Sequence, residues 1–522
     1  VTFLNAHCQQ AICTASRVSF LTGLRPDTTR NWNLQSKFRD IMPNVVTLPQ
    51  HFSDNGYKTY GVGKIFHGQT SNHQDDDHST GADSWNDGWQ NPSNADGIVL
   101  KNHYERGDNT SSSWSWLTWN KRAADDAGHM SYPAPFKPPP DENNTSAGPS
   151  ATDVGEYKAN GITPIEDIDY KDGRAAQLAI GKIAEYAISG EPFFLGLGFQ
   201  KPHLPFNAPK DYWDLYDPDA IDMSFYQQVR DMPEGTNSFT SPYGGEPTSY
   251  GDGETYLPTV AEPDLSIFHI DSMPSVDSAR HLIHGYMACV SFIDAQLGKV
   301  LDALEDPNGD GSDADSISHN TVVILFGDHG FHLGDHGAFW AKHSNYEIST
   351  RVPFIIRSPG MSSLGSRGKM TSAPVELVDI FPTLLDLCSL PIPSTTTRIT
   401  AENDTELYQV LEGTSLVPLL EDPEQPWKSV AFSQYQRYIS YKSSYDSDRP
   451  LSAAGGGKGM GYSIRTDRYR YTEWWKTNGD YGKFGSNTYD PDASRVVAGQ
   501  ASFVELYDYQ NDPGETENLA FT

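Results

Sequence analysis

Segments with helical periodicity alternate with short apolar runs along much of the chain. Apolar residues recur on one face at helical spacing in four segments, 48–55, 173–189, 278–305 and 375–387. Short apolar runs typical of buried strands lie at 57–62, 193–199, 321–326 and 353–356. This alternation predicts an α/β fold with a large, mainly parallel sheet that is flanked by helices.

The pattern changes beyond about residue 415. Residues 462–465 and 469–472 alternate like two antiparallel strands around a turn at 466–468. We therefore expect a catalytic α/β domain over residues 1–415 and a small antiparallel α+β subdomain over 416–522. Two long stretches rich in Gly, Pro, Asn and Ser, at about 86–165 and 205–265, are expected to be irregular inserts.

Three of the predicted strands are followed by titratable or metal-binding residues. These are Lys64 and His67, Lys201 and His203, and Asp328 and His329. Each pair taken alone is more often a turn or a helix cap than a functional site. Ligands of α/β sheets bind beyond the carboxyl ends of the strands, so the agreement of three strand ends favours one site.

The charge of the chain restricts its partners. Lys and Arg number 38 against 69 Asp and Glu, which gives a formal net charge of −31. Such a surface repels nucleic acid and anionic membranes, so neither is an expected partner. A polyanionic substrate requires a local basic pocket. No apolar run approaches the roughly 20 residues that span a bilayer.

The cysteines and the glycosylation sequons bear on the cellular compartment. Cys8, Cys13, Cys289 and Cys388 do not form the pattern of a disulfide framework, and the last two lie in apolar helical patterns typical of buried free thiols. Sequons for N-glycosylation occur at Asn109, Asn143, Asn144 and Asn403. They favour the secretory pathway, with an extracellular or lysosomal destination, although sequons also arise by chance.

Residues 13–25 read C-T-A-S-R-V-S-F-L-T-G-L-R. From the residues alone, this is a short helix with a buried Cys13 and a C-capping Gly23, or Cys13 forms a disulfide or half a metal site with Cys8. The segment also resembles the signature of the sulfatase family, C-x-P/A-S-R followed by L-T-G, with Ala15 where Pro is more common. Further blocks resemble the iduronate sulfatase group of that family: 5–30, 61–68, 71–76, 201–206, 327–337, 340–345, 460–466 and 505–520.

The resemblance implies an alkaline-phosphatase-like fold and hydrolysis of sulfuric esters. Cys13 is then oxidised to formylglycine by a formylglycine-generating enzyme, and its hydrated aldehyde attacks sulfur. The implied catalytic residues are Arg17 and Lys64, which hold the diol, Lys342 and His203, which bind sulfate and protonate the leaving alcohol, and His67, which takes a proton from the second hydroxyl.

The resemblance also implies one calcium ion, bound by Asp328, His329 and the side chain at position 13. His329 stands where the family often has Asn. Two adjacent Asp ligands precede the signature in the family and have no counterpart here, so we expect them upstream of Val1 or on another chain. The implied substrate is a sulfated carbohydrate, with uronate-containing polysaccharides favoured, and the candidate substrate-binding residues are Lys201, Asp76 and Phe331.

Two other functions remain open at this point. One is a phosphomonoesterase or phosphodiesterase of the same superfamily, which Cys13 within the signature argues against. The other is a catalytically inactive glycoprotein, which the retained charged residues argue against. The sequence does not indicate the oligomeric state.

Overall fold

The computed structural model describes residues 1–34, 36–67, 84–90, 92, 167–203, 206, 208–231, 276–338, 342–360, 365–396, 398–400, 406–439, 457–476 and 503–521. Most of the two predicted inserts lies outside these residues. The same holds for five candidate site residues, Asp76, Asn109, Asn143, Asn144 and Asn403.

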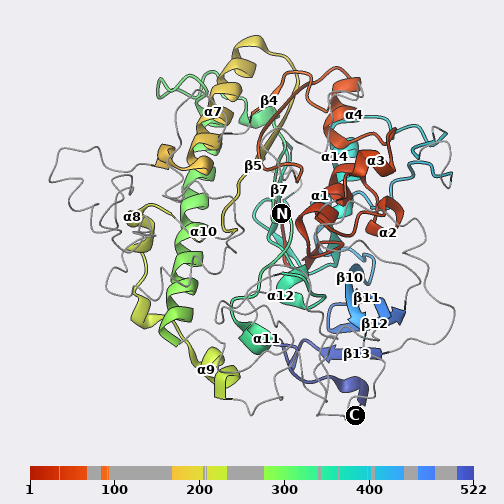
Figure 1. Ribbon diagram of the computed structural model, residues 1–522. Coiled ribbons are helices and arrows are strands. Elements are labelled where there is room, and N and C mark those ends of the chain that lie inside the picture. The colour runs from red at the N-terminus through yellow and green to blue at the C-terminus, as the bar shows by residue number, and fades with distance from the viewer. Residues whose placement is uncertain are drawn as a thin grey trace, which may run out of the picture.

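The main body has three layers (Figure 1). Strands form the middle layer. On one side lie the long helices α7 (Lys171–Ser189) and α10 (Val276–Glu305). On the other side lie α1 (Cys13–Thr22), α4 (Leu48–Asp54) and α14 (Ile380–Leu387). This arrangement confirms the α/β fold class that the alternating pattern predicts.

One sheet of the middle layer is wholly parallel. Its strands run in the order β4 (Trp89–Gln90), β3 (Lys58–Gly63) and β5 (Phe193–Gly198). The amphipathic face of α7 packs on it through small and branched residues, which form a core cluster with Tyr60 and Val62. Helix and sheet therefore bury each other's apolar face, which is the main source of stability in such a layer.

The second sheet of the middle layer is mixed. Its order is β6 (Val323–Phe326), β7 (Phe354–Arg357), β1 (Thr2–Phe3) and β8 (Met370–Thr371). Strand β7 runs antiparallel to both of its neighbours, whereas β1 and β8 are parallel. Within the described residues the strands thus form several small sheets, in which β5 pairs with β3 and β6 pairs with β7. The strand prediction at 353–356 is confirmed within a residue.

The single helix predicted over 375–387 is wrong in its first part. Residues Val375–Glu376 form strand β9, which pairs in parallel with β2 (Ala6–His7), and Leu377–Asp379 form a 3₁₀ turn. Only from Ile380 is the segment α-helical. Pro382 explains the late start, because proline lacks the N–H that an interior helical position requires and is tolerated in the first turn.

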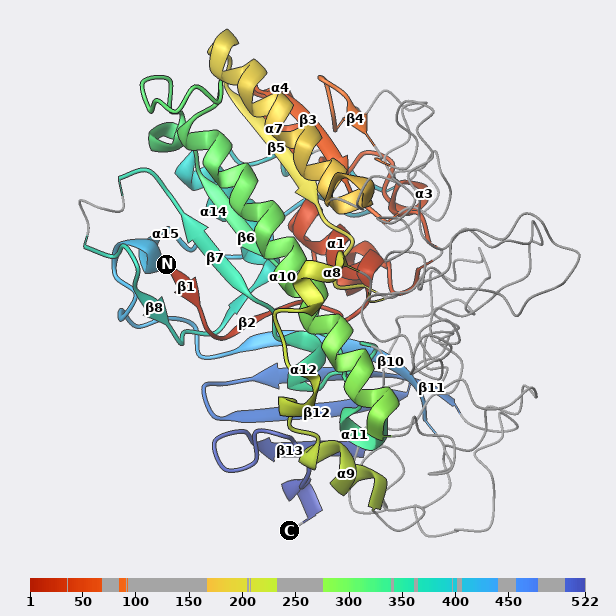
Figure 2. The ribbon, with the colours of Figure 1, turned by 90° about the vertical axis from the view of Figure 1, so that its left-hand side faces the viewer.

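The C-terminal part is an antiparallel sheet at one end of the molecule (Figure 2). Its strands are β10 (Ala431–Ile439), β11 (Gly457–Arg465), β12 (Tyr469–Lys476) and β13 (Phe503–Asp508), in that order. The predicted pair of strands around 466–468 is confirmed as β11 and β12. The domain boundary at residue 415 stays a prediction.

Short helices connect these elements. They are α2 (Pro26–Thr29), α3 (Phe38–Ile41), α8 (Lys210–Trp213), α9 (Ser224–Asp231), α11 (Asp335–Ala338), α12 (Glu347–Thr350) and α15 (Val417–Glu421). No helix within the described ranges is both long enough and apolar enough to cross a bilayer.

Candidate active site

A backbone hydrogen bond connects the carboxyl ends of β3 and β5 at the edge of the candidate site. The Lys64 N–H donates to the carbonyl of Gly198 at 2.7 Å. A Cβ at Gly198 would lie 1.9 Å from the Lys64 carbonyl oxygen, so only glycine permits this close approach. The two strand ends that carry Lys64 and Lys201 are therefore held side by side.

Cys13 is the first residue of α1 and is buried. Gly23 ends the helix in the left-handed conformation and donates its N–H to the Ser19 carbonyl at 2.8 Å, as the capping pattern predicts. All four cysteines are free, which excludes a bond between Cys8 and Cys13. The position of Cys13 at a helix N-terminus favours negative charge on its side chain, because helix dipole and free N–H groups both attract anions.

Positive groups surround the Cys13 side chain. Its Sγ lies 3.2 Å from His329 Nε2 and 3.5 Å from Lys64 Nζ. Burial by itself would raise the pKa of the thiol, but the charges of Lys342, Lys64 and His329 hold this pKa well below its ordinary value. The same charges would stabilise negative charge on an oxygen placed where Sγ lies.

Arg17 connects three segments of the site. Its Nε donates to Asp328 Oδ2 at 2.8 Å, and its Nη1 donates to the carbonyls of Lys64 and Ile65 at 2.5 and 2.7 Å. The Ser16 hydroxyl donates to the Asp328 carbonyl. Burial would raise the pKa of Asp328, but Arg17 and nearby positive groups hold this pKa well below its usual range. The Asp328 carboxylate is therefore ionised and fixed in place.

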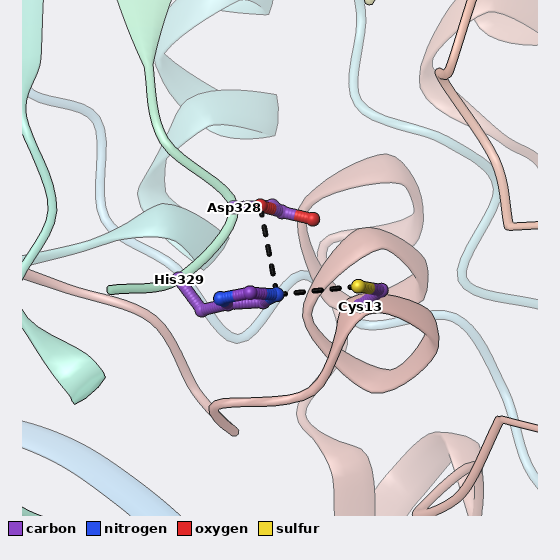
Figure 3. Close-up of side chains that lie close together, drawn as sticks. All are labelled: Cys13, Asp328 and His329. Carbon is purple, nitrogen blue, oxygen red and sulfur yellow. Dashed lines mark hydrogen bonds and ion pairs between the residues drawn. The ribbon is translucent and has the colours of Figure 1, made fainter. Parts of the chain in front are cut away.

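Cys13, Asp328 and His329 together form a candidate metal centre (Figure 3). Within the described part of the chain they are the sole group of three potential ligands, with ligand atoms within 4.8 Å of one another. The His329 ring lies between the other two side chains, and its Nε2 is 3.8 Å from Asp328 Oδ1.

The hydrogen bonding of His329 suits a metal ligand. Its Nδ1 lies 2.7 Å from the Gly330 carbonyl, which can only accept, so Nδ1 carries a proton and a neutral ring offers its Nε2 lone pair to the centre. Burial lowers the pKa of His329, yet Asp328 and Cys13 raise it overall. Their negative charge draws a proton to Nε2, and a cation in the centre would replace that proton. The residues present therefore fit a divalent ion.

The other candidate residues surround this centre at different depths. Lys342 is fully buried, and its positive charge lowers the pKa of Cys13. Lys201 and His203 follow β5, and burial lowers the pKa of Lys201. His67 has a buried Nδ1 without a hydrogen-bond partner in the described ranges. Phe331 packs against Phe206 and Tyr286, with ring centroids 5.9 and 6.3 Å away, in the core cluster beside α10.

Sequence reasoning missed the contact between the start of α1 and the C-terminal sheet. Cys13 belongs to a small apolar cluster with Ile12 and Ala15, and the fully buried Tyr435 of β10 completes it. Gln10 also donates to Gln436 at 3.2 Å, across 426 residues of sequence. No local pattern identifies such a partner, because the contact depends on how the C-terminal sheet docks.

Comparisons with known proteins identify the family of the chain. The sulfatase family profile matches residues 1–390. Human iduronate 2-sulfatase is 32% identical over 560 aligned residues, which cover 99% of this chain and 84% of that protein, and the mouse protein is 31% identical. The predicted resemblance to the iduronate sulfatase group is thus confirmed at the level of sequence similarity.

Solved structures show the same fold at lower identity. A phosphonate monoester hydrolase from Silicibacter pomeroyi superimposes with a TM-score of 0.60 at 19% identity, covering 100% of this chain and 84% of that one. A protein solved in complex with its substrate D-glucosamine-2-N,6-O-disulfate gives a TM-score of 0.53 at 18% identity. The alignment covers 99% of this chain and 85% of that one. Because the family profile spans most of the chain and the curated relatives nearly all of it, the chain belongs to the sulfatase family of sulfuric ester hydrolases.

Proposed function

We propose that this sulfatase cleaves sulfate monoesters of a carbohydrate, with Cys13 in its formylglycine form as the nucleophile and one calcium ion in the centre. The observation that carries the proposal is the setting of Cys13. It begins α1 within the sulfatase signature, and Lys64 and His329 lie within 3.5 Å of its Sγ.

The charge distribution suits sulfate transfer. Cleavage of a sulfate monoester develops negative charge on the leaving oxygen and keeps it on the sulfuryl oxygens, so fixed cations aimed at those atoms are the main requirement. Lys64 and Lys342 already stabilise negative charge on the side chain at position 13. Hydrated formylglycine supplies a nucleophilic hydroxyl and, once sulfated, an easy release of sulfate by elimination, which a sulfated serine lacks.

Other residues handle the protons and the leaving group. We assign His203 to protonation of the leaving alcohol and Lys201 to substrate binding, since both follow β5 beside Lys64. We assign His67 to proton transfer from the second hydroxyl. Its buried Nδ1, which has no hydrogen-bond partner in the described ranges, supports that role. Phe331 contributes an apolar wall.

Asp328 and His329 would hold the cation. When bound, a divalent ion lowers the pKa of the diol and screens the charge of sulfate. Calcium prefers oxygen ligands, which Asp328 and the oxygens at position 13 provide, and the imidazole nitrogen of His329 adds a softer donor. Arg17 keeps Asp328 ionised and oriented for this task.

A uronate-containing polysaccharide is the proposed substrate class. Support comes from the human and mouse relatives, which are named for iduronate. The substrate preference and the oxidation of Cys13 by a formylglycine-generating enzyme fit a protein of the secretory pathway, extracellular or lysosomal. Asp76 is the proposed contact to sugar hydroxyls, and it lies outside the described residues.

Peptide mass spectrometry on active protein tests the nucleophile. Conversion of Cys13 to formylglycine lowers the mass of its peptide by about 18 Da. A preparation that hydrolyses sulfate esters while every such peptide carries unmodified cysteine would refute the proposal. Parallel assays with matched sulfate and phosphate monoesters test the reaction class, and faster hydrolysis of phosphate would favour the phosphoesterase alternative.

A further inference from the structure

Asp172 lies in the first turn of α7 and is almost fully buried. An aspartate at this place in a helix ordinarily interacts only with the positive end of its own helix dipole. Asp172 does something else. Its Oδ1 accepts the N–H of Gln200 at 2.6 Å and its Oδ2 accepts the N–H of Lys201 at 3.1 Å, which are 28 and 29 residues away.

The turn that Asp172 holds carries two site residues. The His203 N–H donates to the Gln200 carbonyl at 3.0 Å, and Lys201 Nζ donates to the His203 carbonyl at 3.2 Å. This turn follows β5 directly, and the end of β5 is bonded to Lys64 through Gly198. One carboxylate therefore connects α7 to the backbone from which His203 and Lys201 project.

Burial of this carboxylate has a cost that the contacts must offset. Burial raises the pKa of Asp172, while the two backbone N–H groups and the charge of Lys201 act in the opposite direction. An asparagine of the same shape offers one acceptor oxygen, and its amide would turn a donor toward the second N–H. The site requires a carboxylate because both acceptor positions are used.

We propose that Asp172 is a positioning residue, which fixes the turn at 200–203 so that His203 can protonate the leaving alcohol and Lys201 can bind substrate. The inference rests on the proposed function, since it assigns Asp172 to the leaving-group side of that site. It predicts a defect that depends on the leaving group. A good leaving group needs no proton, whereas a sugar or alkyl alcohol does.

The test compares Asp172→Asn with wild type on 4-nitrophenyl sulfate and on a sugar or alkyl sulfate. We expect kcat/KM to fall about 10- to 100-fold on the sugar sulfate and less than about threefold on 4-nitrophenyl sulfate, as for partial loss of general acid catalysis. Asp379→Asn is the matched control. Asp379 is also buried and accepts two backbone N–H groups, from Glu376 and Thr414, and its charged partner is Lys428 at 2.8 Å instead of a candidate site residue.

Each outcome decides the proposal. Equal losses on both substrates, or losses that match those of Asp379→Asn at equal thermal stability, would overturn it. If Asp172→Asn does not fold, Asp172→Glu keeps the charge and displaces the turn by one methylene, and the same selective loss is expected. His203→Ala separates the two levels. If His203→Ala loses the same kcat/KM on both substrates, the proposed role of His203 fails. If His203→Ala loses kcat/KM mainly on the sugar sulfate and Asp172→Asn does not, only the proposed role of Asp172 is refuted.

Discussion

Replacing Glu347 by Gln removes one negative charge from a buried cluster between the main body and the C-terminal sheet. Glu347 begins α12, and its carboxylate accepts Arg465 Nε at 2.7 Å and Arg470 Nη2 at 2.6 Å. The two arginines lie on β11 and β12. Arg470 also donates to Glu515 at 2.5 Å. The substitution therefore leaves part of the arginine charge buried without its partner.

The size of the effect follows from the pKa of Glu347. Burial by itself raises this pKa, and neighbouring positive charges lower it from 4.5 to about 2. Those charges belong to His7, Arg470 and Arg465. Burial lowers the pKa of His7 to about 3, so His7 is neutral near pH 7 and the arginines carry the effect there. The whole shift, to which His7 contributes most among the positive groups, corresponds to about 3 kcal/mol, so the arginines account for only part of that energy near pH 7.

The pH dependence has a defined sign. Because the folded-state pKa of Glu347 is depressed, its stabilising contribution is complete above pH 4.5 and is lost as the pH falls toward 2. Burial and the nearby charge of Glu347 raise the pKa of Glu515. Loss of the Glu347 charge relieves this repulsion, so about 3 kcal/mol is an upper estimate of the destabilisation. We expect Glu347→Gln to be destabilised by about 2–3 kcal/mol at neutral pH and to match wild type near pH 2.

Urea unfolding between pH 2 and 8, followed by the fluorescence of the 11 tryptophans, which include Trp474 and Trp475 of β12, measures this difference. Glu473→Gln is the control. Glu473 lies on the same strand, where it accepts hydrogen bonds from the Tyr471 hydroxyl and the Trp475 indole N–H, and within the described ranges it forms no ion pair with an arginine. A loss below about 1 kcal/mol at neutral pH, or a loss that does not change with pH, would refute the reasoning, since desolvation would then cancel the pairing.

Three further predictions concern the site. Removal of divalent ions with a chelator is expected to abolish sulfate release, and calcium to restore it better than magnesium, because magnesium requires a near-ideal octahedron of ligands whereas calcium accepts irregular ligand sets; unchanged activity would contradict the metal assignment. Gly198→Ala places a Cβ against the Lys64 carbonyl, so melting temperature and activity should both fall, whereas Gly181→Ala on α7, with open space at its Cβ, should retain both. Cys13→Ser should fold normally by circular dichroism and release at most one equivalent of alcohol per molecule with no free sulfate, because a sulfated serine has no elimination route; sustained turnover would contradict the formylglycine mechanism.

The parts of the fold that sequence predicts are those specified locally. The strand over 193–199 and the helix over 173–189 are each confirmed within two residues, because their apolar spacing is set by short-range burial. The turn at 466–468 is confirmed for the same reason. The ends of β3 and β5 meet as expected, because the two strands pair in parallel, whereas β6 belongs to a second sheet and its end is connected to that of β3 through Arg17, which bonds Asp328 and the Lys64 carbonyl.

The parts that sequence does not predict depend on distant partners. Val375 is a strand residue because its N–H donates to Asn5 and its strand pairs with β2, which no periodicity indicates. No local pattern indicates the partners of Asp172, and only the fold brings residues 200 and 201 to its carboxylate. Arg17 is recognisable as part of a signature, yet its contact with Asp328 emerges only in three dimensions.

The local charge of the site is opposite to that of the whole chain, and this contrast has a physical consequence. The chain carries −31 overall, which opposes the approach of a polyanion. At physiological ionic strength such repulsion is screened beyond about 8 Å, whereas buried groups are screened much less. Lys64, Lys342 and His329 act on the buried side chain at position 13 inside that distance. Their attraction therefore persists where the repulsion of the surface has decayed, so an acidic protein can still hold a sulfate group.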